Sequence, residues 1–258
     1  MFKNIYPVFE RKRLLKIEML NNMRDFPREM FQILSKDLSN GIVAGAELKV
    51  TDRHLIICPG ILIWCGIVYM MEEELKLPYE PMEKMAYLKV KFMKEQQGTE
   101  GIEYLTSVYI DDTSADNRCE LELGRYKLLA GAKLRDAYTD YDDYSTEYDT
   151  LNRIHVPFAS VGRSTIWSEI LNVFAVTMMK YDMNNPWDCA FCLQCLQLRQ
   201  GMPYEEVKGY LNARTGNIDK EYSNLEIYQE LRKILYNVSG TIRGQNRESR
   251  QEEMILLI

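Results

Sequence analysis

The stretch Tyr87-Leu88-Lys89-Val90-Lys91-Phe92 alternates apolar and polar side chains. Because successive side chains of a β-strand point to opposite faces, this pattern predicts a strand with one buried face. Strand-like runs lie on both sides of it, at 46–50, 55–57, 61–68, 104–110 and 121–128. Strands this short and this closely spaced favour a small antiparallel sheet, sandwich or barrel.

The segment before these strands predicts one helix. Apolar residues recur at helical spacing over 26–38. Asp25 is a suitable N-cap, Pro27 falls in the first turn, and Asn40-Gly41 is a stop signal. The residues that share the apolar face are Phe26, Met30, Ile33, Leu34 and Leu38.

The segment after residue 157 predicts helices alone. Apolar residues recur at helical spacing over 165–180, 187–199, 204–212 and 225–238. The fold class is therefore α+β, with an N-terminal helix and a small antiparallel β-domain followed by an α-helical C-terminal domain. The predicted divisions are a basic segment and helix at 1–40, a β-rich domain at 41–135, an acidic linker rich in tyrosine at 136–156, and an α-helical domain with an apolar tail at 157–258.

Length and charge restrict the class of function. The chain has 258 residues, which suffice for two modest domains. A net charge of -6 argues against a nucleic-acid partner, although Arg11-Lys12-Arg13 forms a local basic patch. The first residues contain no long apolar run, and no stretch reaches about 18 apolar residues, so we expect neither a signal peptide nor a membrane span. Six cysteines without an export signal then predict free thiols and synthesis in the cytoplasm.

Three cysteines recur at every third position of the stretch Trp187-Asp188-Cys189-Ala190-Phe191-Cys192-Leu193-Gln194-Cys195. An iron–sulfur site of this spacing needs a fourth cysteine, and a zinc site needs a second pair of Cys or His ligands. On a helix the three thiols span about 120°, the width of a core-facing stripe. We interpret them as core packing, with a metal site or reactive thiols as the alternatives, and predict no metal ligand and no cofactor.

The segment 136–149 is acidic and rich in tyrosine, and contains neither Lys nor Arg. Carboxylates suit Ca²⁺, but the spacing lacks the Gly and Glu of an EF-hand loop. We therefore interpret the segment as a solvated surface linker. Its charged residues are Asp136, Asp140, Asp142, Asp143, Glu147 and Asp149, and its tyrosines are Tyr138, Tyr141, Tyr144 and Tyr148.

No catalytic residue is predicted. The chain contains none of the patterns GxxxxGK[ST], GxGxxG, GxSxG and HExxH. Its two histidines, His54 and His155, belong to different elements, which leaves little basis for a Ser–His or Cys–His dyad. A hydrolase that uses paired carboxylates stays open, because Asp and Glu are abundant.

The sequence ends in an apolar run of Met254, Ile255, Leu256, Leu257 and Ile258. An exposed run of this kind conflicts with a solitary soluble monomer. Two arrangements would cover it, because it can fold back on its own core or dock on a neighbouring subunit. We take these residues as the candidate partner-docking site.

Between residues 48 and 69 the chain reads Leu48-Lys49-Val50, then His54-Leu55-Ile56-Ile57-Cys58-Pro59-Gly60-Ile61-Leu62, then Gly66-Ile67-Val68-Tyr69. This order of a strand, a Pro-Gly turn and a second strand ending in Gly-x-x-Tyr resembles the small β-domain of baseplate and tail-fibre proteins from bacteriophages and prophage-derived tail particles. The resemblance extends over residues 26–92. No coiled-coil stalk, collagen-like repeat or receptor-binding tip follows, which favours a compact adaptor or baseplate component over a fibre.

The resemblance implies a virion structural protein without enzymatic activity. We expect an assembly component of a phage-tail-like particle, acting through contacts with other tail or baseplate proteins and associated with the particle once assembled. A homo-oligomer is one open arrangement. The alternative is an intracellular enzyme or a nucleic-acid-associated protein that uses the cysteine stretch, the acidic segment or the basic residues at 11–16.

Overall fold

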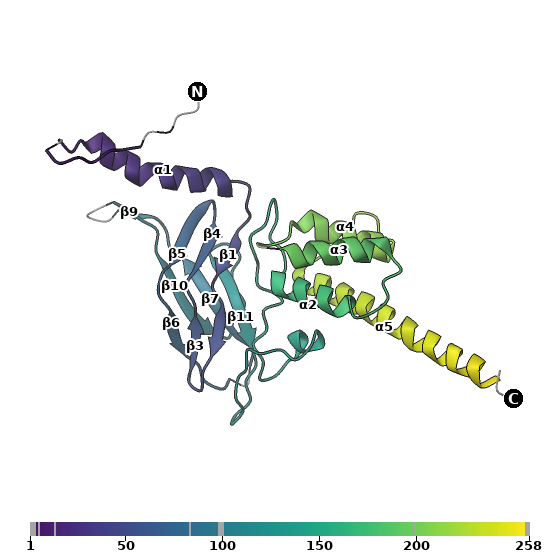
Figure 1. The fold of residues 1–258 in the computed structure, drawn as a ribbon. Coiled ribbons are helices and arrows are strands. Elements are labelled where there is room, and N and C mark those ends of the chain that lie inside the picture. Colours follow the sequence, from purple (N-terminus) through teal and green to yellow (C-terminus); the bar gives the residue numbers. More distant parts are fainter. Residues whose placement is uncertain are drawn as a thin grey trace.

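The computed structural model describes residues 4, 6–12, 14–82, 84–97, 101–198 and 200–255, with side chains described up to residue 240. The fold is α+β, as predicted. One helix, α1 (Ile17–Ser35), lies across one end of a β-rich part, and four further helices pack beside that part (Figure 1). These helices are α2 (Ser168–Met178), α3 (Pro186–Gln197), α4 (Tyr204–Thr215) and α5 (Asn224–Ile255).

The strands form small antiparallel sheets with the orders β10-β7-β11, β1-β4-β5, β2-β3-β6 and β8-β9. In chain order, the first seven strands are β1 (Gly41–Gly45), β2 (Leu48–Val50), β3 (His54–Ile57), β4 (Gly60–Trp64), β5 (Ile67–Met71), β6 (Leu75–Pro78) and β7 (Ala86–Phe92). The remaining strands are β8 (Gln96–Gln97), β9 (Ile102–Glu103), β10 (Thr106–Asp111) and β11 (Glu120–Tyr126).

Strand β7 occupies the centre of its sheet and confirms the alternation of the opening stretch. Leu88, Val90 and Phe92 lie in the β-core, the cluster of buried apolar residues from the sheets. Lys89 on the opposite face is also buried, with 1% of its surface exposed, where a half-buried strand predicts exposure. Its Nζ lies 2.9 Å from Asp111 Oδ1 and 3.3 Å from Glu120 Oε2, so carboxylates of both neighbouring strands neutralise the buried charge.

The Pro-Gly turn is confirmed, since β3 ends at Ile57 and β4 begins at Gly60. The two strands belong to different sheets, so this turn carries the chain from one sheet to the next. The run at 61–68 was predicted as one strand with a bend, and it is instead a hairpin of β4 and β5. Cys65 (φ 50°) and Gly66 (φ 76°) form its two-residue turn, and positive φ at both positions matches the twist of the strands.

The C-terminal helices enclose a second cluster of buried residues, the helical core. The four predicted helices are confirmed, and apart from the C-terminal end of α5 their ends differ by a few residues. Helix α5 begins with a capping box, because Ser223 Oγ and Glu226 exchange hydrogen bonds with each other's backbone N–H groups at 3.3 and 2.8 Å. It continues to Ile255, well beyond the predicted end at 238.

Helix α1 begins at Ile17, nine residues before its predicted start at Phe26, and this corrects two details of the prediction. Pro27 lies inside the helix rather than in its first turn, and Asp25 is a helical residue rather than the N-cap. The physical reason is that residues 17–25 extend the same apolar repeat and contain no Gly or Pro.

The prediction that 136–149 is solvated was wrong for its centre. Tyr141 and Tyr144 are 2% and 3% exposed and belong to the helical core. Asp143 is buried as well, and both of its oxygens accept hydrogen bonds from Arg135 at 2.5 Å. The arginine lies one position outside the segment, so the buried carboxylate is neutralised although the segment itself has no basic residue.

The two cores meet along residues 157–167. Ile42 N donates to Pro157 O and Ala159 N donates to Ile42 O, so β1 pairs with this segment. A Cβ at Gly41 would lie 2.6 Å from Pro157 O, so only glycine allows this approach. Trp167 packs against both cores. The boundaries at 40, 135 and 156 stay predictions. None of the described helices has the length and apolarity needed to cross a bilayer.

Candidate functional site

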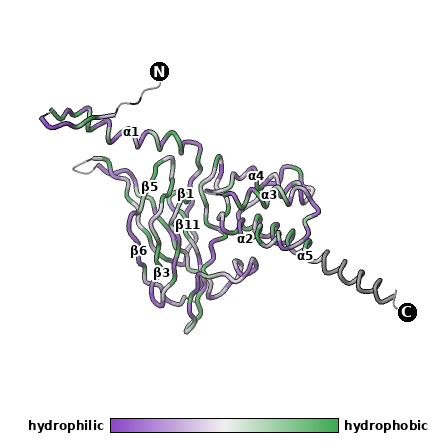
Figure 2. The backbone as a smooth tube through the Cα atoms, in the orientation of Figure 1, coloured by the Kyte–Doolittle hydropathy of each residue, from purple (hydrophilic) through white to green (hydrophobic). Residues whose placement is uncertain are grey.

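Helix α1 presents its apolar face to solvent. Figure 2 shows hydrophobic positions recurring along this helix at the edge of the molecule. Among the residues of α1, only Ser35 is buried. The exposed apolar side chains are Ile17 (72%), Leu20 (46%), Met23 (53%), Phe26 (41%), Met30 (51%), Ile33 (69%) and Leu34 (73%). Exposed apolar residues in this number on one helix are typical of an interaction surface. Ile17 lies about 180° around the helix from Phe26, so we call the other six residues the α1 face.

The spacing on α1 is that of a helix-packing seam. Met19, Met23, Phe26, Met30 and Ile33 follow one another at alternating steps of four and three residues. Such steps keep the side chains on one side of a helix over several turns. The prediction at 26–38 found the second half of this seam as the apolar face of a helix. Met19 and Met23 were the signal that it missed.

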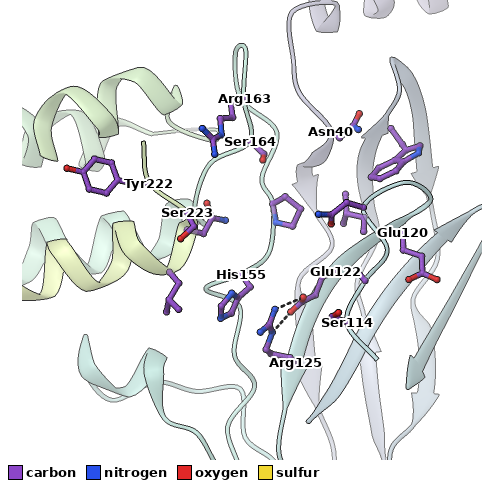
Figure 3. A pocket seen from close by; sticks show the side chains of 17 residues that line it. Asn40, Ser114, Glu120, Glu122, Arg125, His155, Arg163, Ser164, Tyr222 and Ser223 are labelled. Atoms are coloured by element: carbon purple, nitrogen blue, oxygen red, sulfur yellow. Dashed lines mark hydrogen bonds and ion pairs between the residues drawn. The ribbon is translucent and has the colours of Figure 1, made fainter. Parts of the chain in front are cut away.

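A polar groove lies between the β-rich part and the helices, with a cavity volume of about 650 Å³ (Figure 3). On its β side, Arg125 donates to both oxygens of Glu122 at 2.6 and 2.7 Å, and its guanidinium lies 4.9 Å from the ring centre of Tyr87. His155 lies beside this pair (Figure 3). Burial, helped by the charge of Arg125, lowers the pKa of His155, which favours a neutral imidazole.

The helical side of the groove is also internally paired. Arg163 forms an ion pair with Glu221 and lies 4.4 Å from the ring centre of Tyr204. The hydroxyl of Ser223 donates to Glu226 at 2.9 Å, within the cap of α5. Because these groups already bind one another, the groove is suited to polar contact and offers no activated nucleophile among the residues that the structure describes.

The cysteine stretch forms helix α3, and the packing interpretation is confirmed for two of the three thiols. Cys192 and Cys195 lie in the helical core with 0% and 1% exposure, and Cys189 is half-buried. Burial raises the pKa of Cys192 to about 12, and it also raises the pKa of Cys195, so both thiols are poorly reactive. Within the described residues, no group of three or more Cys, His, Asp or Glu is placed to hold a metal ion.

The predicted docking residues Met254 to Ile258 lie outside the residues whose side chains the structure describes. Their role therefore stays a prediction. The residues that the structure brings forward instead are those of the α1 face, at the other end of the chain.

Comparisons with known proteins give little. No family model matches the chain, and no curated protein matches it. Among solved structures, a crystal structure of TssK is similar over 88% of this chain and 69% of that chain, at 7% sequence identity and a TM-score of 0.41. A likeness at this level carries no argument about function, so the proposal below rests on the residues of this chain.

Proposed function

We propose that this protein is a structural component of a phage-tail-like particle, a baseplate part or tail adaptor, that works through contacts with neighbouring proteins and performs no chemistry. The resemblance of residues 26–92 to the β-domain of such proteins supports the particle assignment. The α1 face supports the mode of action, since no described residue of this chain covers its apolar side chains, and an apolar surface of this kind is suited to packing on another protein.

The polar side of α1 favours a protein partner over a membrane surface. Amphipathic helices that lie on membranes carry mainly Lys and Arg on the polar side. Here the polar side is mixed, with two basic and three acidic residues, and Arg24 pairs with Asp25 at 2.6 Å. These residues are Glu18, Arg24, Asp25, Arg28 and Glu29. A balanced polar side stays in water while the apolar side packs on another protein.

The shape of the partner surface follows from the spacing. A seam with alternating steps of four and three residues packs best against another helix or a groove between helices. Met23 and Met30 lie on either side of Phe26 at its centre, and their unbranched side chains adapt to irregular partner surfaces. We expect the partner to present an apolar helical surface of matching length.

The test is to sediment tail-like particles from induced source cells and to quantify this chain by mass spectrometry. A fixed stoichiometry with tail proteins is expected. Finding the chain only in the light fractions, with no tail protein attached, would contradict the particle assignment. Deletion of 254–258 tests the predicted tail separately: it should weaken assembly without weakening the fold, and normal assembly would show that the tail has no docking role.

A further inference from the structure

A second cleft, on the β1 side of the junction, contains a buried arginine without a counterion. Only 3% of the surface of Arg153 is exposed. Its Nη2 donates to Ala46 O at 3.2 Å, whereas its Nε is buried without a hydrogen-bond partner in the part of the chain that the structure describes. No carboxylate among the described residues forms an ion pair with it. The position is fixed, because Asn152 beside it pairs with the backbone of Arg125.

This arrangement is unfavourable as it stands. Burial lowers the pKa of Arg153 to about 10, since the low-dielectric surroundings disfavour its charge. The ring centre of Trp167 lies 4.5 Å from the guanidinium and recovers part of the lost hydration energy. A cation–π contact does not satisfy the buried Nε donor, which needs an oxygen acceptor.

Arg153 borders an open cleft of about 740 Å³, which we call the Arg153 cleft. Its walls are aromatic, because Tyr138 stacks on Tyr144 at 4.1 Å and Trp167 meets Phe158 at 6.2 Å. Tryptophan, tyrosine and a desolvated arginine are the residues that contribute most to protein–protein binding. The cleft thus has the composition of an interface centre.

The rim of the Arg153 cleft has the opposite charge. Glu47 and Glu169 line it and are exposed, and Asp136 lines it while one of its oxygens accepts from Val50 N at 2.8 Å. The charge of Glu47 is near enough to offset part of the lowering of the Arg153 pKa, but Glu47 forms no ion pair with Arg153 in the described structure. A ligand that reaches Arg153 must therefore carry a negative group at its centre. Its outer groups must be neutral or basic, because the acidic rim surrounds them.

We propose that the Arg153 cleft binds a segment of a partner protein that places a carboxylate on the Arg153 guanidinium and basic side chains against Glu47 and Glu169. The carboxylate supplies the acceptor that Nε lacks, and the basic flanks neutralise the rim. A peptide segment fits better than a small acid, because the aromatic walls offer more apolar area than a small acid can cover. This site is separate from the α1 face and does not depend on the particle assignment.

The probe is a library of random 12-residue peptides displayed on phage and selected on the full-length chain. We expect selected peptides to share an Asp or Glu flanked by Lys or Arg. For a synthetic selected peptide, replacing that acid by its amide should weaken binding by about thirtyfold or more, the usual effect of breaking a desolvated charge pair. Arg153→Met should weaken binding as much, whereas Arg118→Met, at an exposed arginine outside the cleft, should leave it unchanged.

Selected peptides without a shared acid, or equal binding to the Arg153→Met protein, would overturn the proposal. If Arg153→Met does not fold, the double variant Glu47→Lys/Glu169→Lys decides, because both side chains are exposed: binding of the basic-flanked peptide should fall severalfold, and unchanged binding would overturn the proposal. If succinate competes as strongly as the peptide, the cleft binds a small dicarboxylate, and the proposal of a protein partner is overturned.

Discussion

Helices α1 and α2 carry comparable apolar stripes but meet different surroundings. In α2, Ile170, Leu171 and Phe174 are 0% exposed and face the other C-terminal helices. In α1, Phe26 and Met30 are 41% and 51% exposed. The periodicity of a sequence predicts that a helix forms and which of its sides is apolar. It does not predict whether the residues that pack on that side belong to the same chain.

The largest expected effect is on the folded core. Phe174→Ala removes a ring that contacts Tyr141, Phe191 and Tyr210, and we expect it to lower the free energy of unfolding by about 3–5 kcal/mol. The matched change Phe26→Ala should lower it by no more than about 0.5 kcal/mol, because that ring is 41% exposed and belongs to neither core. Urea denaturation followed by circular dichroism measures both. Similar losses in the two variants would mean that α1 is part of the core.

The second comparison uses two Arg–Asp pairs, one buried and one exposed. Asp143→Asn removes a carboxylate held by Arg135, Thr139 and Thr146, and should cost about 1.5–3 kcal/mol at neutral pH. The same change at Asp25, which pairs with Arg24 in water, should have no measurable effect.

The buried pair also predicts a pH dependence. The hydrogen bonds and charge of Arg135 hold the pKa of Asp143 well below its ordinary value of about 3.9. A lowered folded-state pKa contributes stability above that ordinary value, and this contribution is lost as the pH falls below it. The free energy of unfolding should therefore fall less steeply between about pH 5 and pH 2 in Asp143→Asn than in the unchanged protein. Parallel curves would show that Asp143 does not titrate as described.

These residues show how far the sequence could predict the structure. The alternation of β7, the C-terminal helices and the burial of Cys192 and Cys195 follow from local periodicity and side-chain size. The burial of Lys89 and of Asp143 does not, because each depends on an opposite charge that the fold brings from elsewhere. A local sequence pattern predicts that a charged residue is exposed, unless the opposite charge that pairs with it in the fold is known.

The candidate site divides in the same way. The second half of the α1 face was visible as an apolar repeat at 26–38, but its exposure was not, because exposure depends on the absence of neighbours in three dimensions. The Arg153 cleft could not be predicted at all. Its parts come from residues 43–48, 136–144, 153–173 and 200–201, which only folding brings together.

Another small effect is expected at Arg153, which forms no ion pair with a described residue. Arg153→Met removes an unpaired buried charge and one hydrogen bond to Ala46 O. These effects oppose each other, so the free energy of unfolding should change by no more than about 1 kcal/mol in either direction. Thermal and urea denaturation both measure it. A loss as large as that of Phe174→Ala would show that the arginine is needed for folding.

The central claim is that the α1 face is an assembly surface, and one measurement tests it most directly. Phe26→Gln/Met30→Gln changes the face and Arg28→Gln/Glu29→Gln changes the polar side, while both keep good helix formers. Each variant is expressed in source cells in place of the natural chain, and its amount in sedimented particles is measured. The account predicts unchanged unfolding for both variants, loss of the first from particles and retention of the second. Retention of the first at natural stoichiometry would contradict it.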